Sequence, residues 1–318
     1  MYVLDFDYIS KLNVSPQQIY DWCSEVWKIK SKCVLPAKTK MWQGSSGRYI
    51  TMPCVIPDED IAGVKFISRN IESLNDVPAR NSNIMIQQCS KMGLLAVVDG
   101  IWITNMRTGA IAAHSVLTYS KSNFKTIGMI GLGLAAWSFM YIFGNVYRLP
   151  LMVKLFKYKD QAEKFIDRFA KFFPHLNFEI VDSVEEVCSC DTVVSAISYA
   201  HENLCDDSVF NPGCLIVPIH TAGFQNCDQT FDRFVIDDHE HVKGFKYYDS
   251  FKQKAVEMGD VENNLCAGRN NDEERIIAYC GGIALHDIYI AHKIYEIALQ
   301  RKDVPEVKMH FPNKHLWV

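Results

Sequence analysis

The segment GLGLAA at residues 131–136 places small residues where a peptide backbone must come close to a phosphate. In this GxGxxA pattern, Gly131 allows a tight turn and Gly133 lets the backbone approach a pyrophosphate, while Ala136 lets the next helix pack on the preceding strand. A helix that begins there offers free N–H groups and the positive end of its dipole to the phosphates. The pattern therefore predicts a dinucleotide-binding site.

The end of the next strand-like segment bears on which dinucleotide is bound. Folds of this kind often carry an acid there, about 20 residues after the glycines, that binds the ribose 2′-OH. This chain reads LFKYKD instead, with Lys157 and Lys159 at that place. A cation suits a 2′-phosphate, so we expect NADP(H) to be favoured, with NAD(H) as the other candidate. The alternative is that both lysines are solvated surface residues.

The glycine pattern lies inside an uncharged stretch, residues 126–147, which has a second interpretation as a membrane span because about 20 apolar residues can cross a bilayer. Its glycines gather near one end, and basic residues flank both sides, so the charge asymmetry of a membrane segment is missing. We therefore expect a buried helix over 137–147 and no membrane contact.

Short apolar segments alternate with helical patterns after residue 125, and this alternation predicts a parallel sheet with helices on both faces. The expected strands are 127–130, 151–158, 191–198, 214–219 and 233–237, with a helix over 159–173. The preceding part mixes short strands and helices, including a strand over 93–100 and a helix over 107–120. A long helix, roughly 282–301, closes the pattern.

Composition excludes several classes of protein. The 318 residues suffice for one large domain or two ordinary ones, and 48% hydrophobic against 22% charged residues indicates a sizeable core. A net charge of −4 without a long basic run lacks the electrostatic footprint of a nucleic-acid binder.

Eleven cysteines without a CxxC pair, and an acidic start, MYVLDFDYIS, in place of a signal peptide, lead us to expect a cytoplasmic protein with reduced thiols. Cys188 and Cys190 are too close in sequence for a usual zinc pair, and we interpret them as packing residues. The acidic and histidine-containing segment 236–244 is interpreted as a solvated turn, so no metal site is expected.

Several separated segments together resemble the ornithine cyclodeaminase/mu-crystallin family. They are GRYITMP (47–53), GVKFIS (63–68), VVDGIWITNMRTGAIAA (97–113), IGMIGLGLAA (127–136), DTVVSAIS (191–198) and AGRNNDEERIIAYCGGIALHDIYIA (267–291). The resemblance implies an α/β protein with two domains. Residues 1–120 and about 288–318 would form an α+β substrate-binding and dimerisation domain, and 121–287 a Rossmann NAD(P)-binding domain. It also implies a homodimer and a small amino, imino or 2-oxo acid as substrate.

The resemblance further implies that two arginines and a lysine surround the substrate, at positions matched here by Arg48, Lys65 and Arg107. Their chemistry agrees with this role, because a guanidinium grips a carboxylate with two hydrogen bonds and a lysine can exchange a proton at the reacting centre. For Arg107 the alternative is a structural salt bridge near the start of a helix.

Further positions are expected to contact the cofactor. Thr108 and Gly109 follow Arg107 and are expected to open a helix near the cofactor. Ser195 and Ala196 end a strand where the nicotinamide end of the cofactor usually lies. The expected cofactor-binding residues are therefore Arg107, Thr108, Gly131, Gly133, Leu134, Ala135, Lys157, Ser195 and Ala196.

The chain also departs from the family pattern. Ile50 stands where ornithine cyclodeaminases have a glutamate, and Ala135 stands where the family commonly has glutamine. The family's GxD loop is replaced by a different loop, 218–230, in which His220 and Asp228 are candidates for proton transfer, with Asp228 named as catalytic beside Lys65.

The absence of this glutamate argues against deaminating cyclisation, whereas hydride transfer does not require it. The favoured function is therefore an NAD(P)-dependent imino acid reductase or amino acid dehydrogenase. An ornithine cyclodeaminase-type lyase that releases ammonia and recycles its cofactor is the alternative, and a non-catalytic binder of a small acid is a third hypothesis.

Overall fold

The computed structural model describes residues 1–44, 47–70, 80–301 and 303–308. The chain divides into two compact units. The first unit contains residues 1–13, 32–103 and 287–318, and the second contains 14–31 and 104–286. This division differs from the expected domain boundaries at 14–31 and 104–120, which group with the second unit, and the functional roles assigned to the two domains stay predictions.

The first unit contains a six-stranded sheet in the order β1-β6-β5-β4-β3-β2. Its neighbouring strands are antiparallel except for the parallel pair β1 and β6. The strands are β1 (Tyr2–Leu4), β2 (Thr39–Gln43), β3 (Gly47–Ile56), β4 (Ile61–Asn70), β5 (Arg80–Gln88) and β6 (Gly93–Asp99). The short strands expected in this part are therefore wrong for β3 and β4, which are ten residues long and pair along their whole length.

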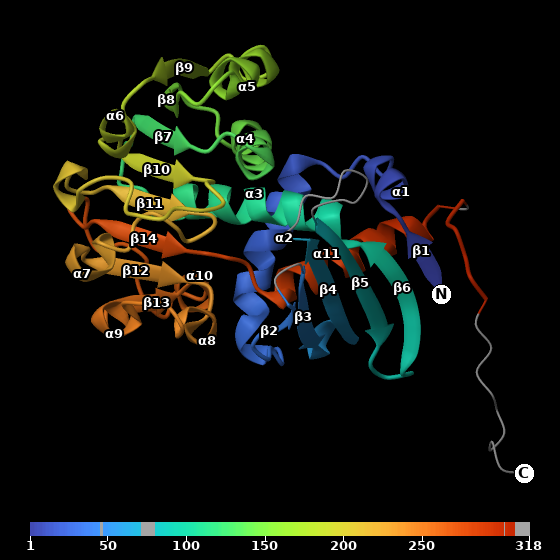
Figure 1. Ribbon diagram of the computed structural model, residues 1–318. Helices are drawn as coiled ribbons and strands as arrows, with labels where there is room; N and C mark the ends of the chain where they lie inside the picture. The colour runs from blue at the N-terminus through green and yellow to red at the C-terminus, as the bar shows by residue number, and fades with distance from the viewer. Residues whose placement is uncertain (45–46, 71–79, 302, 309–318) are drawn as a thin grey trace, which may run out of the picture. The chain divides into compact units, whose positions relative to one another are not determined.

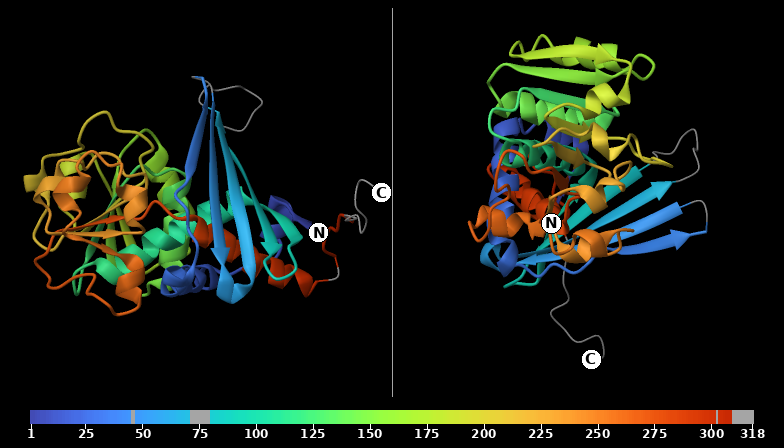
Figure 2. Two further views of the ribbon diagram at one scale, coloured as in Figure 1. Left: turned by 90° about the horizontal axis from the view of Figure 1, so that it is seen from below. Right: turned by 90° about the vertical axis from the view of Figure 1, so that its left-hand side faces the viewer.

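One face of this sheet is covered by α11 (Ala284–Leu299), which runs along it in Figure 2. The two pack so closely that a side chain at Gly63 on β4 would collide with Ile288. The short helix α1 (Phe6–Ser10) and the 3-10 turns at Lys30–Lys32 and Pro57–Glu59 complete the early part of the chain.

The second unit contains an eight-stranded, all-parallel sheet in the order β13-β12-β14-β11-β10-β7-β8-β9. Figure 1 shows its strands side by side in this order. Its strands are β7 (Thr126–Ile130), β8 (Leu151–Phe156), β9 (Leu176–Val181), β10 (Thr192–Ser195), β11 (Leu215–Pro218), β12 (Arg233–Ile236), β13 (Ala255–Glu257) and β14 (Ile276–Tyr279). The order reverses at β7, and the crevice beyond the carboxyl ends at such a point is where dinucleotides bind in this type of fold.

Helices accompany this sheet. They are α2 (Pro16–Ile29), α3 (Gly100–Tyr119), α4 (Leu134–Val146), α5 (Gln161–Phe169), α6 (Val184–Cys188), α7 (Cys227–Thr230), α8 (His239–Val242), α9 (Tyr248–Phe251) and α10 (Met258–Glu262), with a 3-10 turn at Asp207–Val209. The long helices α3 and α11 each contain residues of both units.

The α/β fold class is confirmed, and the five strands expected after residue 125 are present as β7, β8, β10, β11 and β12. Sequence reasoning missed β9, β13 and β14. Within the described part of the chain no helix is long and apolar enough to cross a membrane, so the uncharged stretch is a strand, a glycine turn and the buried helix α4.

Gly109 allows α3 to approach α4 closely. A Cβ atom at Gly109 would overlap the backbone carbonyl of Ser138 on α4. We expect Gly109→Ala to lower the free energy of unfolding by about 1–3 kcal/mol in a urea titration, because overpacking outweighs the helix propensity of alanine. Gly244→Ala is the control, since no atom lies within 4 Å of its Cβ position. An unchanged Gly109→Ala midpoint would contradict this packing.

Candidate functional site

Lys65 is the most deeply buried charged group of the first unit's sheet. Its side chain is fully buried on β4, and its cross-strand neighbours Met52 and Ile84 are buried and apolar. Its ammonium lies 2.7 Å from Oδ1 of Asp287, in the first turn of α11, and that side chain is also fully buried. A carboxylate at hydrogen-bond distance favours the charged ammonium form. Sequence reasoning found Lys65 but missed Asp287.

Arg48 lies on the same face of the sheet as Lys65, near the start of β3. It is directly opposite Trp42 on β2 and Arg69 on β4, and its guanidinium lies 5.4 Å from the centre of the Trp42 ring. Burial and the charge of Arg69 lower the pKa of Arg48. Its buried Nε has no hydrogen-bond partner within the described residues. A partly buried cation beside another cation is a suitable place for an anion.

The register of β3 and β4 places an apolar pair between these two cations. Side chains two residues apart on a strand share a face, so Ile50 and its partner Ile67 lie between the Arg48 pair and the Lys65 pair. The position where ornithine cyclodeaminases carry a glutamate is therefore part of an apolar surface between Arg48 and Lys65.

The glycine turn after β7 has the predicted form. Gly131 has a φ of +78°, and a Cβ there would lie 2.7 Å from the backbone nitrogen of Ile197. Gly133 is the N-cap of α4 and supplies no side-chain hydrogen bond, and no atom lies within 4 Å of its Cβ position. No side chain at Gly133 therefore blocks the first N–H groups of α4, and a pyrophosphate could come close to them.

The other expected cofactor-binding residues of this edge follow two neighbouring strands. Leu134 is exposed and Ala135 half-buried in the first turn of α4. Ser195 ends β10 with a buried Oγ that has no hydrogen-bond partner in the described part of the chain, and Ala196 follows it. An unsatisfied buried hydroxyl at this edge is consistent with a polar ligand group.

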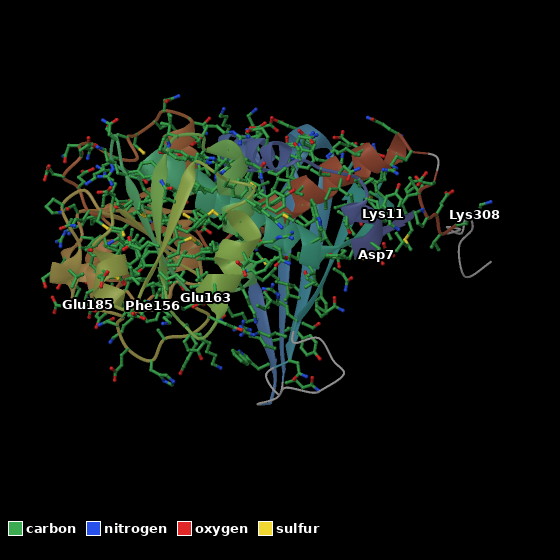
Figure 3. All side chains as sticks on the ribbon, turned by 90° about the horizontal axis from the view of Figure 1, so that it is seen from above. Asp7, Lys11, Phe156, Glu163, Glu185 and Lys308 are labelled. Carbon is green, nitrogen blue, oxygen red and sulfur yellow. The ribbon has the colours of Figure 1, made fainter. Side chains whose placement is uncertain are left out.

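Lys157 directly follows Phe156, the last residue of β8, which Figure 3 labels, and Lys159 lies two residues further along the chain. The side chain of Lys157 is 51% exposed and lies 3.7 Å from the exposed Asp182. Lys159 has a φ of +53°, and its ammonium lies 5.4 Å from the centre of the Tyr158 ring. Both lysines remain accessible, as a role in binding a phosphate requires.

Arg107 lies in the second unit, within α3. Its side chain is buried, and Nη1 donates a hydrogen bond to the carbonyl oxygen of Gly281 at 3.2 Å. The expectation that Thr108 and Gly109 open a helix is wrong, because α3 already begins at Gly100. Gly109 packs against α4 instead, so it serves the contact between the two helices.

Asp228 lies in the apolar core of the second unit. It is only 1% exposed, and its Oδ1 accepts a hydrogen bond from the hydroxyl of Tyr279 at 2.6 Å. Burial raises the pKa of Asp228 to about 6. The catalytic role expected for Asp228 stays a prediction, and the structure adds that its carboxyl is buried and bonded to a core tyrosine. His220 is exposed in the loop after β11.

The structure adds two residues that the sequence did not single out. Asp237 follows β12 and is only 2% exposed, so the interpretation of its segment as a solvated turn is wrong at this residue. Its Oδ2 accepts a hydrogen bond from the N–H of Gly282 at 2.8 Å. The next residue, Asp238, caps α8 and pairs with Lys30 at 2.8 Å. Among the described residues no cluster suits a metal ion.

The raised pKa of Asp228 has a consequence for stability. The carboxyl of Asp228 holds its proton more tightly in the folded protein than in the unfolded chain. The free energy of unfolding therefore falls as pH rises from the ordinary pKa of 3.8 through about 6. Asp228→Asn keeps an oxygen for Tyr279 and carries no charge. We expect it to be about 1–2 kcal/mol more stable than the wild type at pH 7.5, with the gain vanishing near pH 4, in urea titrations.

The control for this prediction is Asp249→Asn, whose side chain is 88% exposed. It is expected to change stability little at either pH. A wild type that is more stable than Asp228→Asn at pH 7.5 would contradict the buried, proton-holding state of this carboxyl.

Comparisons with known proteins agree with this architecture. A dehydrogenase of N-((2S)-2-amino-2-carboxyethyl)-L-glutamate from Staphylococcus aureus is 25% identical over 279 residues, 80% of either chain. An archaeal alanine dehydrogenase dimer with bound NAD has a TM-score of 0.87 at 20% identity, covering 98% of this chain and 99% of that chain. A Thermococcus litoralis Δ1-pyrroline-2-carboxylate reductase in complex with NADH and L-proline has a TM-score of 0.85 at 20% identity, covering 96% and 100%.

These structural likenesses show the fold. The model of the ornithine cyclodeaminase/mu-crystallin family matches residues 28–302, which is most of the sequence. The chain belongs to the ornithine cyclodeaminase/mu-crystallin family.

Proposed function

We propose that this protein is an NAD(P)-dependent oxidoreductase that interconverts a small α-imino acid and the corresponding amino acid. The observation that carries the proposal is Lys65, a fully buried ammonium on the sheet face that also bears Arg48. Burying a charge is unfavourable unless it is paired, and the proposed reason for keeping it there is proton transfer.

Each residue has a distinct role in the proposed reaction. Arg48 and Arg107 bind the substrate carboxylate, because guanidinium groups match its geometry. Lys65, held as an ammonium by Asp287, gives a proton to the imine nitrogen in reduction and takes it back in oxidation. When bound, the nicotinamide supplies the hydride that adds to the imine carbon, or accepts it in the reverse direction.

We propose NADP(H) as the preferred cofactor, with NAD(H) as the second candidate. The accessible Lys157 and Lys159 after β8 support binding of a 2′-phosphate. NAD and NADH in the two related structures favour the second candidate.

A homodimer is proposed from the face of the first unit's sheet opposite Lys65. This face exposes Met41, Phe66 and Met85, each more than 40% accessible, and Tyr49 stacks on Phe66. Large apolar side chains gathered on one sheet face favour association with another such face.

All eleven cysteines are free thiols, which supports the proposed cytoplasmic location.

The alternative is a lyase of the ornithine cyclodeaminase type, which the family membership supports. Ile50 and Ile67 oppose it, because they place an apolar surface between Arg48 and Lys65. A non-catalytic binder of a small acid would retain the arginines but has no use for a buried proton donor.

The deciding experiment follows nicotinamide absorbance with a panel of cyclic imino acids and of 2-oxo acids mixed with amines, and separately with ornithine, while ammonia is measured. Net oxidation of NADPH or NADH supports the proposal. Ammonia release from ornithine at constant absorbance would establish the lyase, and tight binding of a small acid without turnover would establish the binder.

Lys65→Met tests the proton donor in the same assay. We expect turnover to fall by at least about 100-fold, because general acid–base catalysis commonly contributes that much, while cofactor binding stays near the wild-type value. Lys65→Met combined with Asp287→Asn avoids an unpaired buried carboxylate if the single variant does not fold. The control is Lys91→Ala on the exposed turn between β5 and β6. Undiminished turnover in the folded variants would end the assignment of Lys65.

Lys157→Ala tests the cofactor preference. We expect the wild type to bind NADPH about tenfold more tightly than NADH, as one favourable charge contact would produce, and the variant to lose most of that difference. Lys164→Ala, on the exposed face of α5, is the control. Equal affinities of the wild type for both cofactors would contradict the preference.

A further inference from the structure

The guanidinium of Arg107 contacts the backbone turn at Gly281 and Gly282. Its Nη1 donates to the carbonyl oxygen of Gly281 at 3.2 Å. A Cβ atom at Gly282 would overlap the same guanidinium nitrogen. The arginine therefore needs both the carbonyl of Gly281 and the missing side chain of Gly282 in order to occupy its position.

The turn itself has a conformation that few residues adopt. Gly282 has a φ of +83°, in the left-handed region that favours glycine. It follows β14, whose last residue pairs with Ile236 of β12, and the N–H of Asp237 donates onward to the carbonyl of Tyr279 at 3.4 Å. The parallel ladder thus brings Asp237 and the turn to the same edge of the sheet.

Asp237 holds this turn through its side chain. Its buried Oδ2 accepts the hydrogen bond from the N–H of Gly282 at 2.8 Å. A hydrogen bond from a backbone N–H to a carboxylate is stronger than one between neutral groups. The carboxylate of Asp237 therefore holds Gly282 in place. Gly282 in turn leaves the space that the guanidinium of Arg107 occupies.

We propose that Asp237 is a positioning residue that acts through Gly282 to hold Arg107 in place for the substrate carboxylate. The inference rests on the proposed function only for the identity of the bound group. The chain of contacts from Asp237 to Gly282 to Arg107 lies entirely within the second unit.

Kinetics of Asp237→Ala and Asp237→Asn test the proposal on whichever imino acid the wild type reduces. We expect Asp237→Ala to raise KM for that acid about 10-fold to 100-fold with a smaller change in kcat, because a displaced arginine loses binding of the carboxylate. Asp237→Asn retains an oxygen acceptor and is expected to recover most of this loss. An asparagine variant as impaired as the alanine variant would overturn the proposal, because the loss would then not depend on keeping a hydrogen-bond acceptor for the N–H of Gly282.

Two further variants separate positioning from general damage. In an Arg107→Lys background, Asp237→Ala is expected to add little, because residues that act as a unit are not additive. A full additional loss would show that Asp237 acts by another route. Asp238→Ala is the matched control, since it removes a neighbouring carboxylate that caps α8 and binds Lys30 but not Gly282. Should Asp237→Ala fail to fold, Gly282→Ala displaces Arg107 from the other side of the same contact.

Crystal structures of the wild type and the Asp237 variants give a readout independent of turnover. We expect the distance from Arg107 Nη1 to the Gly281 oxygen to be kept in Asp237→Asn and lost in Asp237→Ala. An unmoved Arg107 in Asp237→Ala would overturn the inference even in an active enzyme. A wild type inactive on the whole panel, with Arg107 displaced in Asp237→Ala, would instead overturn the proposed function and leave the positioning intact.

Discussion

The ion pair between Lys65 and Asp287 is the interaction on which the buried face of the first unit's sheet depends. Both side chains are fully buried, and removing two charges from water costs several kcal/mol each unless they meet in good geometry. The 2.7 Å contact joins the middle of β4 to the first turn of α11, across 222 positions of sequence. It allows an ammonium to persist among apolar strand residues, where it is shielded from water.

In the second unit the carboxyl ends of parallel strands do the positioning. The turn after β7 presents the start of α4, the end of β10 presents Ser195, and the end of β14 forms the support of Arg107. A parallel sheet gathers these loops at one edge by its geometry alone. The glycines at 131 and 282 then set how close another group can come to the backbone.

The two arginines proposed to bind the substrate carboxylate are held in different ways. Arg48 lies beside another arginine and over Trp42, with a buried nitrogen that no described residue satisfies. Arg107 is fixed against a backbone turn by hydrogen bonding and shape. The first arrangement leaves a positive charge for an incoming anion, and the second determines where a guanidinium lies.

The sequence by itself determined what depends on local pattern. The spacing of small residues in GLGLAA predicted the turn at Gly131 and the helix after it, and the alternation of strands and helices predicted the parallel sheet. It also identified Lys65 as a charged residue among apolar neighbours, whereas Arg107 was identified through the family resemblance. It missed β14, although this strand is as long as β10, β11 and β12, which were predicted.

Tertiary structure alone decided which partners these residues meet. Asp287 for Lys65, Gly282 for Arg107, and Tyr279 for Asp228 are distant in sequence, and no spacing rule connects them. The same limit explains why the burial of Asp228 was not predicted, because a carboxyl in a loop and one in a core look alike in sequence until the fold determines their burial. The local sequence pattern specifies whether a segment forms a helix, a strand or a turn. Only the packing of the whole chain determines which residues surround a charged side chain.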